Sequence, residues 1–189
     1  MNIPSKIQCF KLMKDMKMMD HIVDHSIAVA NVAVFLCFKL KKIYPQINTP
    51  LTLSAALLHD ITKTRSFETK EIHSQTGADI LSDLGYPEVG NIIRQHVLLD
   101  SYASQTPVSE QEIVNYADKR TLHDKVVSLK NRMEYIQCRY NADNALEERF
   151  RMMITNTLAL EKKIFDLLDI SPDQLAEHVK QKIRKEDWT

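Results

Sequence analysis

One stretch of the chain, Leu53-Ser54-Ala55-Ala56-Leu57-Leu58-His59-Asp60, is a short apolar run that closes on two potential metal ligands. The run is typical of a buried helix, and Pro50 suits the first turn of that helix. Neighbouring residues of a regular helix point about 100° apart, so a helix end helps His59 and Asp60 to reach one cavity. We therefore expect a helical protein with a polar site at the end of this segment.

The composition favours helices and a soluble protein. The chain has 189 residues, 44% of them hydrophobic and 26% charged, which suits one domain with a real core. Only three glycines occur, and β-hairpins need glycine often. Twenty-five basic residues balance twenty-five acidic ones, so no overall field favours nucleic acid or a membrane as a partner. The three cysteines are odd in number, match no zinc-finger or thioredoxin spacing, and indicate reduced thiols in a cytoplasmic protein.

The expected fold class is all-α, a single helical domain with a C-terminal helical extension. Gly85 suits a left-handed helix cap, Pro87 suits a first turn, and Ser109 with Glu112 forms a capping box. No confident strand is expected, and residues 61–69 are expected to form a polar loop. The domain that carries the site is assigned to residues 1–140, and residues 141–189 to the extension, which packs on the core or on a second subunit. Helices are expected near residues 6–17, 21–43, 49–60, 71–84, 87–98, 109–118, 124–138, 143–168 and 172–185.

Six potential ligands lie on or at the ends of these helices. Imidazole nitrogens and carboxylate oxygens together are the ligand set of a borderline divalent metal that performs hydrolytic chemistry. Four of the six would form a first site, and the other two could hold a second ion with Asp60 as the bridge. His21, four residues before His25, is the first alternative ligand because both face one side of a helix. The six are His25, His59, Asp60, His73, His96 and Asp118.

The order and local contexts of these ligands resemble the HD-domain superfamily of metal-dependent phosphohydrolases. That family places a histidine first, then a His-Asp pair, then further histidines and a closing aspartate. The resemblance covers about residues 20–137. The segments that carry it are HSIAVA (25–30), LLHDITK (57–63), HSQTGADIL (73–81), IIRQH (92–96) and YADKR (116–120).

The chain departs from the family pattern at two positions. Thr62 stands where many members have glycine, and Val97 follows His96 where many members have a second histidine. The tripeptide Gly85-Tyr86-Pro87 also spells a motif of the family's cyclic-dinucleotide phosphodiesterases. In those proteins it follows the late histidines, whereas here it precedes His96. We therefore interpret it as residues that end one helix and begin the next.

The resemblance implies a metal-dependent phosphohydrolase acting on a small-molecule phosphate ester, with a nucleotide as the expected substrate. One or two divalent ions are implied, among iron, manganese, cobalt, nickel, zinc and magnesium. Asp60 is expected to be the central ligand and to orient the attacking water, and Lys63 to reach a phosphate as a point charge. Arg120 and Arg132 are further phosphate-binding candidates, although the adjacent Lys119 competes with Arg120 for the inward position.

Two alternatives stay open at this point. The chain could be a non-catalytic nucleotide-binding or metal-stabilised regulatory module with the same ligand set. The helices after residue 140 could also serve an interaction with a partner, most simply as a homodimer. His123 is expected at the edge of the pocket, and no stretch reaches the roughly 18 uninterrupted apolar residues of a membrane span.

Overall fold

The structure is a computed structural model, and it describes residues 1–102, 107–140, 144–179, 183–184 and 186. Its described part is helical apart from one short hairpin, so the all-α expectation is confirmed. The longer elements are α1 (Lys6–Asp15), α2 (Asp20–Leu40), α3 (Thr49–Leu58), α4 (Lys63–Thr69), α5 (His73–Asp83), α6 (Pro87–Arg94), α7 (Glu110–Lys119), α8 (Leu129–Tyr140) and α9 (Asn144–Phe165). The shorter ones are β1 (Thr121–Leu122), β2 (Lys125–Val126), the 3₁₀ turn Pro172–Gln174 and α10 (Leu175–His178).

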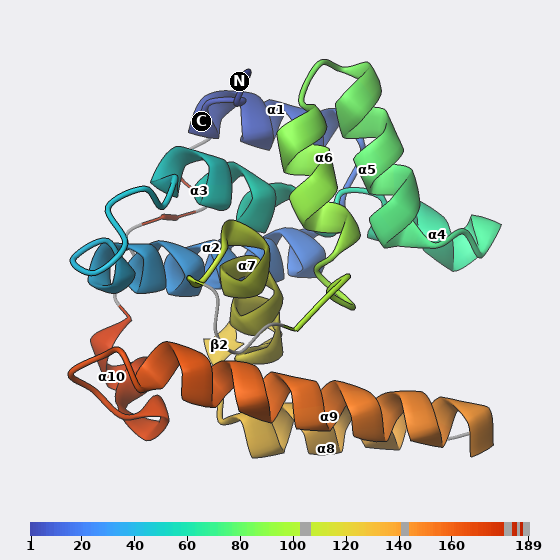
Figure 1. Ribbon diagram of the computed structural model, residues 1–189. Helices are drawn as coiled ribbons and strands as arrows, with labels where there is room; N and C mark the ends of the chain where they lie inside the picture. The colour runs from blue at the N-terminus through green and yellow to red at the C-terminus, as the bar shows by residue number, and fades with distance from the viewer. Residues whose placement is uncertain (103–106, 141–143, 180–182, 185, 187–189) are drawn as a thin grey trace.

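Helix α2 is the central element of the molecule. It runs below α3, α7 crosses in front of it, and it packs against both (Figure 1). By length and composition it is the one described helix that could cross a membrane. However, 67% of its most apolar window is buried inside the protein, which is what a core helix requires. Its side chains meet those of α3 and α7 in one continuous hydrophobic core.

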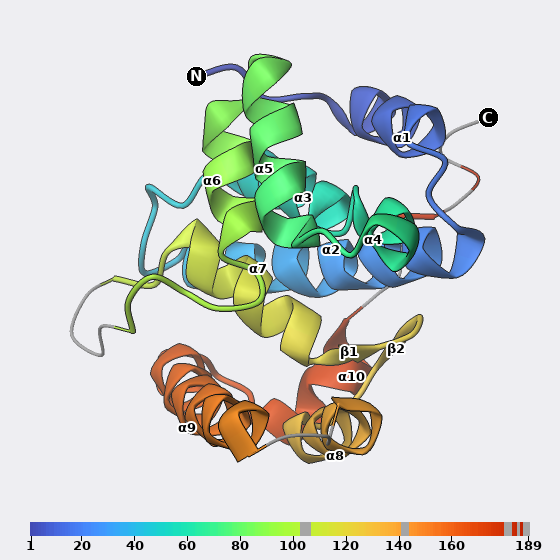
Figure 2. The ribbon, with the colours of Figure 1, turned by 90° about the vertical axis from the view of Figure 1, so that its right-hand side faces the viewer.

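Helices α5 and α6 pack as a close pair (Figure 2), and α6 packs against α3. The loop between them has the expected helix end and helix start, since Gly85 adopts a φ of 86° and Pro87 is the first residue of α6. Gly90 brings the two helices together, because a Cβ atom there would lie only 2.7 Å from the Ala78 carbonyl oxygen. This packing places the start of α5 beside the end of α6.

Three local expectations were wrong. Residues 63–69 form the polar helix α4 instead of a loop, and Lys70 ends it with a φ of 60°. Residues 121–126 form an antiparallel hairpin, so the following helix begins at Leu129 and not at residue 124. The Ser128 hydroxyl caps the start of α8 by accepting a hydrogen bond from the main-chain N–H of Asn131.

The last part of the chain is also less helical than expected. Instead of a helix over 172–185, a 3₁₀ turn leads into the single turn α10, and the backbone becomes extended at Val179. The reason is a tertiary contact, because the Asn31 side chain exchanges two hydrogen bonds with the main chain of Ile183 (3.0 and 3.1 Å). Residues 180–182, 185 and 187–189 lie outside the described part.

The second half of helix α9 packs on the core. It lies alongside α8 below α2 and α7, as Figures 1 and 2 both show. Leu160, Ile164 and Phe165 on its second half are buried in the main core. The first half of α9 extends past the core, where with α8 it comes to line the site.

Candidate metal centre

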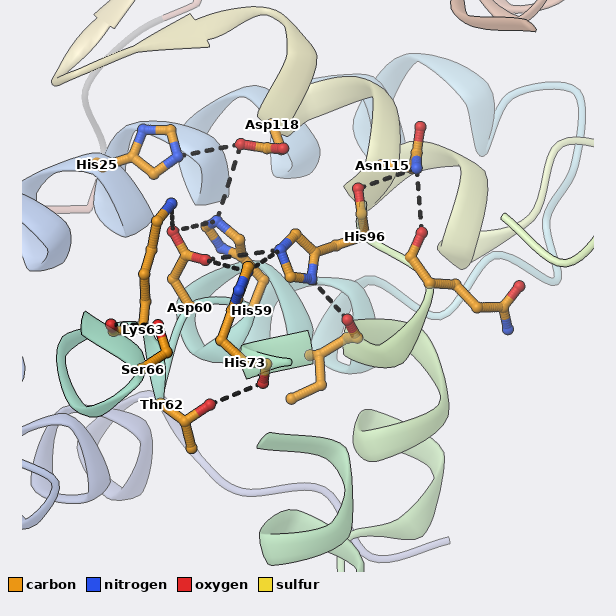
Figure 3. Close-up of polar contacts among 12 residues, drawn as sticks. His25, His59, Asp60, Thr62, Lys63, Ser66, His73, His96, Asn115 and Asp118 are labelled. Carbon is orange, nitrogen blue, oxygen red and sulfur yellow. Dashed lines mark hydrogen bonds and ion pairs between the residues drawn. The ribbon is translucent and has the colours of Figure 1, made fainter. Parts of the chain in front are cut away.

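The six candidate ligands converge on one buried point (Figure 3). They come from five different parts of the fold, which is the arrangement a rigid metal site needs. His25 lies on α2, His59 and Asp60 follow the last turn of α3, and Asp118 lies on α7. The other two, His73 and His96, lie at the first residue of α5 and just after α6. All but His73 are buried.

The first group of ligands surrounds Asp60 on one side. Ligand atoms of His25, His59 and Asp60 lie within 4.8 Å of one another. Asp118 closes this group, since its Oδ1 atom lies 3.1 Å from Nε2 of His25 and 4.0 Å from Nε2 of His59. The set offers two imidazole nitrogens and two carboxylates from three elements, which suits a divalent metal ion.

The second group lies on the other side of the same aspartate. Oδ1 of Asp60 lies 3.3 Å from Nε2 of His73 and 3.5 Å from Nε2 of His96. The two Nε2 atoms are 3.2 Å apart. Ligand atoms of these three residues also lie within 4.8 Å of one another, so Asp60 belongs to both groups. The carboxylate is placed as a bridge between two ions would be.

Two buried atoms of the candidate ligands have no hydrogen-bond partner among the described residues. These are Nε2 of His59 and Oδ1 of Asp60, and both residues are about 1% exposed. Burying a polar atom without a partner costs about 1–3 kcal/mol, so such atoms are rare in a folded protein. A cation between them would satisfy both. The residues present therefore fit the divalent ion that the sequence predicts.

Hydrogen bonds to the main chain fix how three of the imidazoles are oriented. The Nδ1 atoms of His25, His59 and His96 lie 2.9, 2.8 and 2.6 Å from the carbonyl oxygens of His123, Ala56 and Ile93. Because a carbonyl only accepts, each Nδ1 carries the proton in these contacts. The Nε2 lone pair of a neutral ring is then left for a metal, which is the usual arrangement around ligand histidines.

The electrostatics of the centre keep its carboxylates ionised. Burial alone would raise their pKa values, but His59 and Lys63 hold the pKa of Asp60 well below its usual range. Lys119 does the same for Asp118. Burial lowers the pKa of His96 to about 4, so this imidazole stays neutral at pH 7. The two aspartates and His96 are thus in the state that binds a cation.

Three cationic side chains surround the two aspartates. Nζ of Lys63 lies 2.7 Å from Oδ2 of Asp60, and Nζ of Lys119 lies 3.0 Å from Oδ2 of Asp118. The guanidinium of Arg132 lies 3.3 Å from Oδ1 of Asp118. All three side chains line the cavity beside the ligands.

The structure does not bring Arg120 to this cavity, which corrects its assignment as a phosphate-binding residue. Its buried guanidinium contacts Glu161 and donates to the carbonyl oxygens of Val127 and Pro172. Arg120 therefore ties α7 to the C-terminal helices. The adjacent Lys119 is the residue that points inward.

Two supporting residues were not recognised from the sequence. The Thr62 hydroxyl donates to the main-chain oxygen of His73 at 2.7 Å. The side-chain amide of Asn115 donates to the main-chain oxygen of His96 at 2.9 Å. Each therefore fixes the backbone of one ligand of the second group. Thr62 was noted only as a departure from glycine, and its φ of −105° shows that this position needs none. No sequence pattern marks Asn115.

The centre opens into a cavity of about 470 Å³. His21 and His123 both lie in its wall. His21 lies there without joining either group of close ligands, so it is not a substitute for His25 among the described residues. His123 occupies the expected edge position, at the turn of the β1–β2 hairpin with a φ of 55°.

A family model for the HD domain matches residues 22–170, and the chain therefore belongs to the HD domain family. The matched range includes all six ligands and continues past residue 140 through α8 and α9. The division into 1–140 and 141–189 stays a prediction. Comparisons with curated proteins and with solved structures returned no significant match.

Proposed function

We propose that this protein is a metal-dependent hydrolase of a phosphate ester in a small metabolite. One observation carries the proposal: two groups of metal ligands share Asp60, and three cationic side chains stand beside them. Metal-assisted phosphoryl transfer needs this combination of cation-binding and phosphate-binding groups. Membership of the HD family supports the same reaction class.

His25, His59, Asp60 and Asp118 would hold one ion, and His73 and His96 a second with Asp60 between the two. Divalent ions at this centre would offset negative charge on the phosphate and lower the pKa of bound water from about 15.7 towards 7. The chain's own contribution is to hold the ligands deprotonated and the substrate in place. Lys63 and Arg132 would bind phosphate oxygens, the first as a point charge and the second as a planar fork.

The state of Lys63 suits this role. Although burial lowers its pKa, the carboxylates of Asp60 and Asp118 raise it overall, so the ammonium group stays charged. Its side chain is 30% exposed and sits at the first residue of α4. It can therefore meet a phosphate that enters from the cavity while remaining beside the ligand Asp60.

The first experiment measures bound metal and phosphate release together. The purified protein is loaded separately with manganese, cobalt, nickel, zinc, iron and magnesium, and a panel of nucleotides, sugar phosphates and alkyl phosphates is tested. We expect near two ions per chain and metal-dependent release of phosphate or alcohol. One ion with release would retain the hydrolase and remove His73 and His96 from the ligand set.

The matched variants are Asp60→Asn, which alters the shared ligand, and Asp83→Asn, an exposed aspartate on α5. We expect Asp60→Asn to lose metal and activity while Asp83→Asn keeps both. A wild-type protein that binds metal and nucleotide without releasing product would instead establish the regulatory module. Absence of both metal binding and release would rule out the hydrolase.

A further inference from the structure

The cavity has two chemically different ends. Its inner end carries the metal ligands with Lys63, Lys119 and Arg132, which together suit a single phosphate group. Residues of α4, of the segment after α6, and of helices α8 and α9 line its outer part. Figures 1 and 2 show where these elements lie in the fold. The outer walls are mostly apolar. The apolar residues that form them are Ile22, Phe67, Val97, Leu98, Leu122, Ile136, Phe150, Met152 and Met153.

Several of these apolar side chains face solvent. Phe67 is 43% exposed, Val97 42%, Leu98 46% and Met152 54%. They come from three separate parts of the chain and meet at the same cavity. Exposed apolar side chains that gather around a functional pocket are typical of a binding site for apolar ligand surface.

The same walls offer few groups that could read a sugar or a base edge. The polar side chains of the outer part are His21, His123, Gln137 and Arg139, with the hydroxyl of Tyr135. Two of them are already engaged with each other, because Arg139 donates to that hydroxyl at 2.7 Å. The Tyr135 ring also packs edge-on against His123. A ligand rich in hydroxyl groups would lose its hydration here with little in return.

We propose that the outer cavity binds a large apolar leaving group, so that the substrate is the phosphate monoester of a lipophilic or aromatic alcohol. This rests on the proposed phosphohydrolase function and narrows its substrate class. In the reaction the ester P–O bond breaks and a P–O bond to the water oxygen forms. One water proton ends on the departing alcohol, which leaves inorganic phosphate in the inner end.

The test is a series of alkyl phosphates from ethyl to octyl on the metal-loaded protein, with ribose 5-phosphate and adenosine monophosphate beside it. Each buried methylene contributes about 0.8 kcal/mol, so kcat/KM should rise about two- to fourfold per carbon. The kcat/KM for pentyl phosphate should exceed that for ribose 5-phosphate, which has the same number of carbons, by more than about tenfold. The kcat/KM for octyl phosphate should also exceed that for adenosine monophosphate.

Two variants of α9 locate the effect. Met153→Ser removes an apolar side chain from the cavity wall, and Leu158→Ser removes one that is 52% exposed and lies outside the described wall. We expect Met153→Ser to reduce the rise of kcat/KM with alkyl chain length. Leu158→Ser should leave that rise unchanged. Circular dichroism and the unfolding midpoint check that both variants fold.

Binding of octylphosphonate and ethylphosphonate, neither of which can be hydrolysed, separates the two proposals. Release of phosphate with no dependence on chain length, or a preference for ribose 5-phosphate or the nucleotide, would overturn the apolar leaving group and keep the hydrolase. Tight binding of octylphosphonate with no turnover of any ester would overturn the hydrolase and keep the apolar binding site. Equal affinity for the two phosphonates would contradict the apolar site even if no ester is hydrolysed.

Discussion

The Nζ atom of Lys119 lies 2.7 Å from the main-chain oxygen of His96. The same atom lies 3.0 Å from the Asp118 carboxylate, so one buried ammonium group joins ligands of the first and second groups. It ties the end of α7 to the segment that follows α6. The relative position of the two ligand groups therefore depends on a residue that is not itself a candidate ligand.

Lys119→Met should destabilise the protein and loosen the centre. Removing one partner of a buried ion pair costs about 3–5 kcal/mol, because the other charge is left without compensation. Loss of a residue that orients ligands lowers metal affinity by about 10–100-fold. Urea unfolding of the metal-free protein and a metal titration measure the two effects. Lys125→Met, on the exposed side of the hairpin, is the control, and an equal response of both variants would contradict the prediction.

Thr62→Val should weaken the second group of ligands without changing side-chain shape. The variant removes the hydroxyl that donates to the main-chain oxygen of His73 and leaves that oxygen without this partner. We expect a loss of about 1–3 kcal/mol of unfolding free energy. The number of bound ions should fall from two towards one, as measured by metal analysis of the purified protein. Thr62→Ser, which keeps the hydroxyl, should retain both ions.

The metal-free protein should lose stability between about pH 6.5 and pH 4 because of His96. Its pKa falls from 6.5 to about 4 on folding, so within this range the unfolded chain binds more protons than the folded one. Stability due to the neutral imidazole is therefore complete above pH 6.5 and is lost as the pH falls. A shift of this size corresponds to about 3 kcal/mol. Urea unfolding of wild type and His96→Gln at pH 7 and pH 4.5 tests this, since the variant should show a smaller decrease.

Arg120 and Arg132 should respond differently to the same substitution. Arg120→Met leaves Glu161 without its buried partner, so it should cost about 3–5 kcal/mol of stability. Any folded fraction should keep the wild-type KM. Arg132→Met should raise KM for a phosphate ester, since its guanidinium lines the cavity. Unfolding curves and steady-state kinetics of the two variants measure the contrast, and a raised KM in Arg120→Met would refute the structural role.

Gly90→Ala should separate α5 from α6. The new Cβ atom would lie 2.7 Å from the Ala78 carbonyl oxygen, which belongs to the backbone and cannot rotate away. Overpacking of this kind costs about 1–3 kcal/mol and outweighs the better helix propensity of alanine. Gly77→Ala is the comparison, because its nearest contacts at 3.1 and 3.2 Å are the methyl ends of Ile61 and Ile93. Thermal unfolding should place Gly90→Ala below Gly77→Ala.

Most of the helices before residue 120 could be predicted because their ends carry local signals. The capping box of Ser109 and the glycine and proline positions act within a few residues, so they are visible in the sequence. Helix α4 was missed because it is short and polar and has no apolar stripe to reveal its period. The end of the chain was mispredicted because Asn31, far away in sequence, engages the main chain of Ile183.

The sequence by itself determined the set of candidate ligands, since the six residues could be named from their types, order and helical contexts. The tertiary structure decided their arrangement: two groups that share Asp60, imidazoles held by main-chain oxygens, and Lys119 facing inward while Arg120 faces α9. The physical reason is the sequence distance over which each interaction acts. Capping and periodicity act over a few residues, whereas the direction of a buried charge depends on partners that only folding brings close.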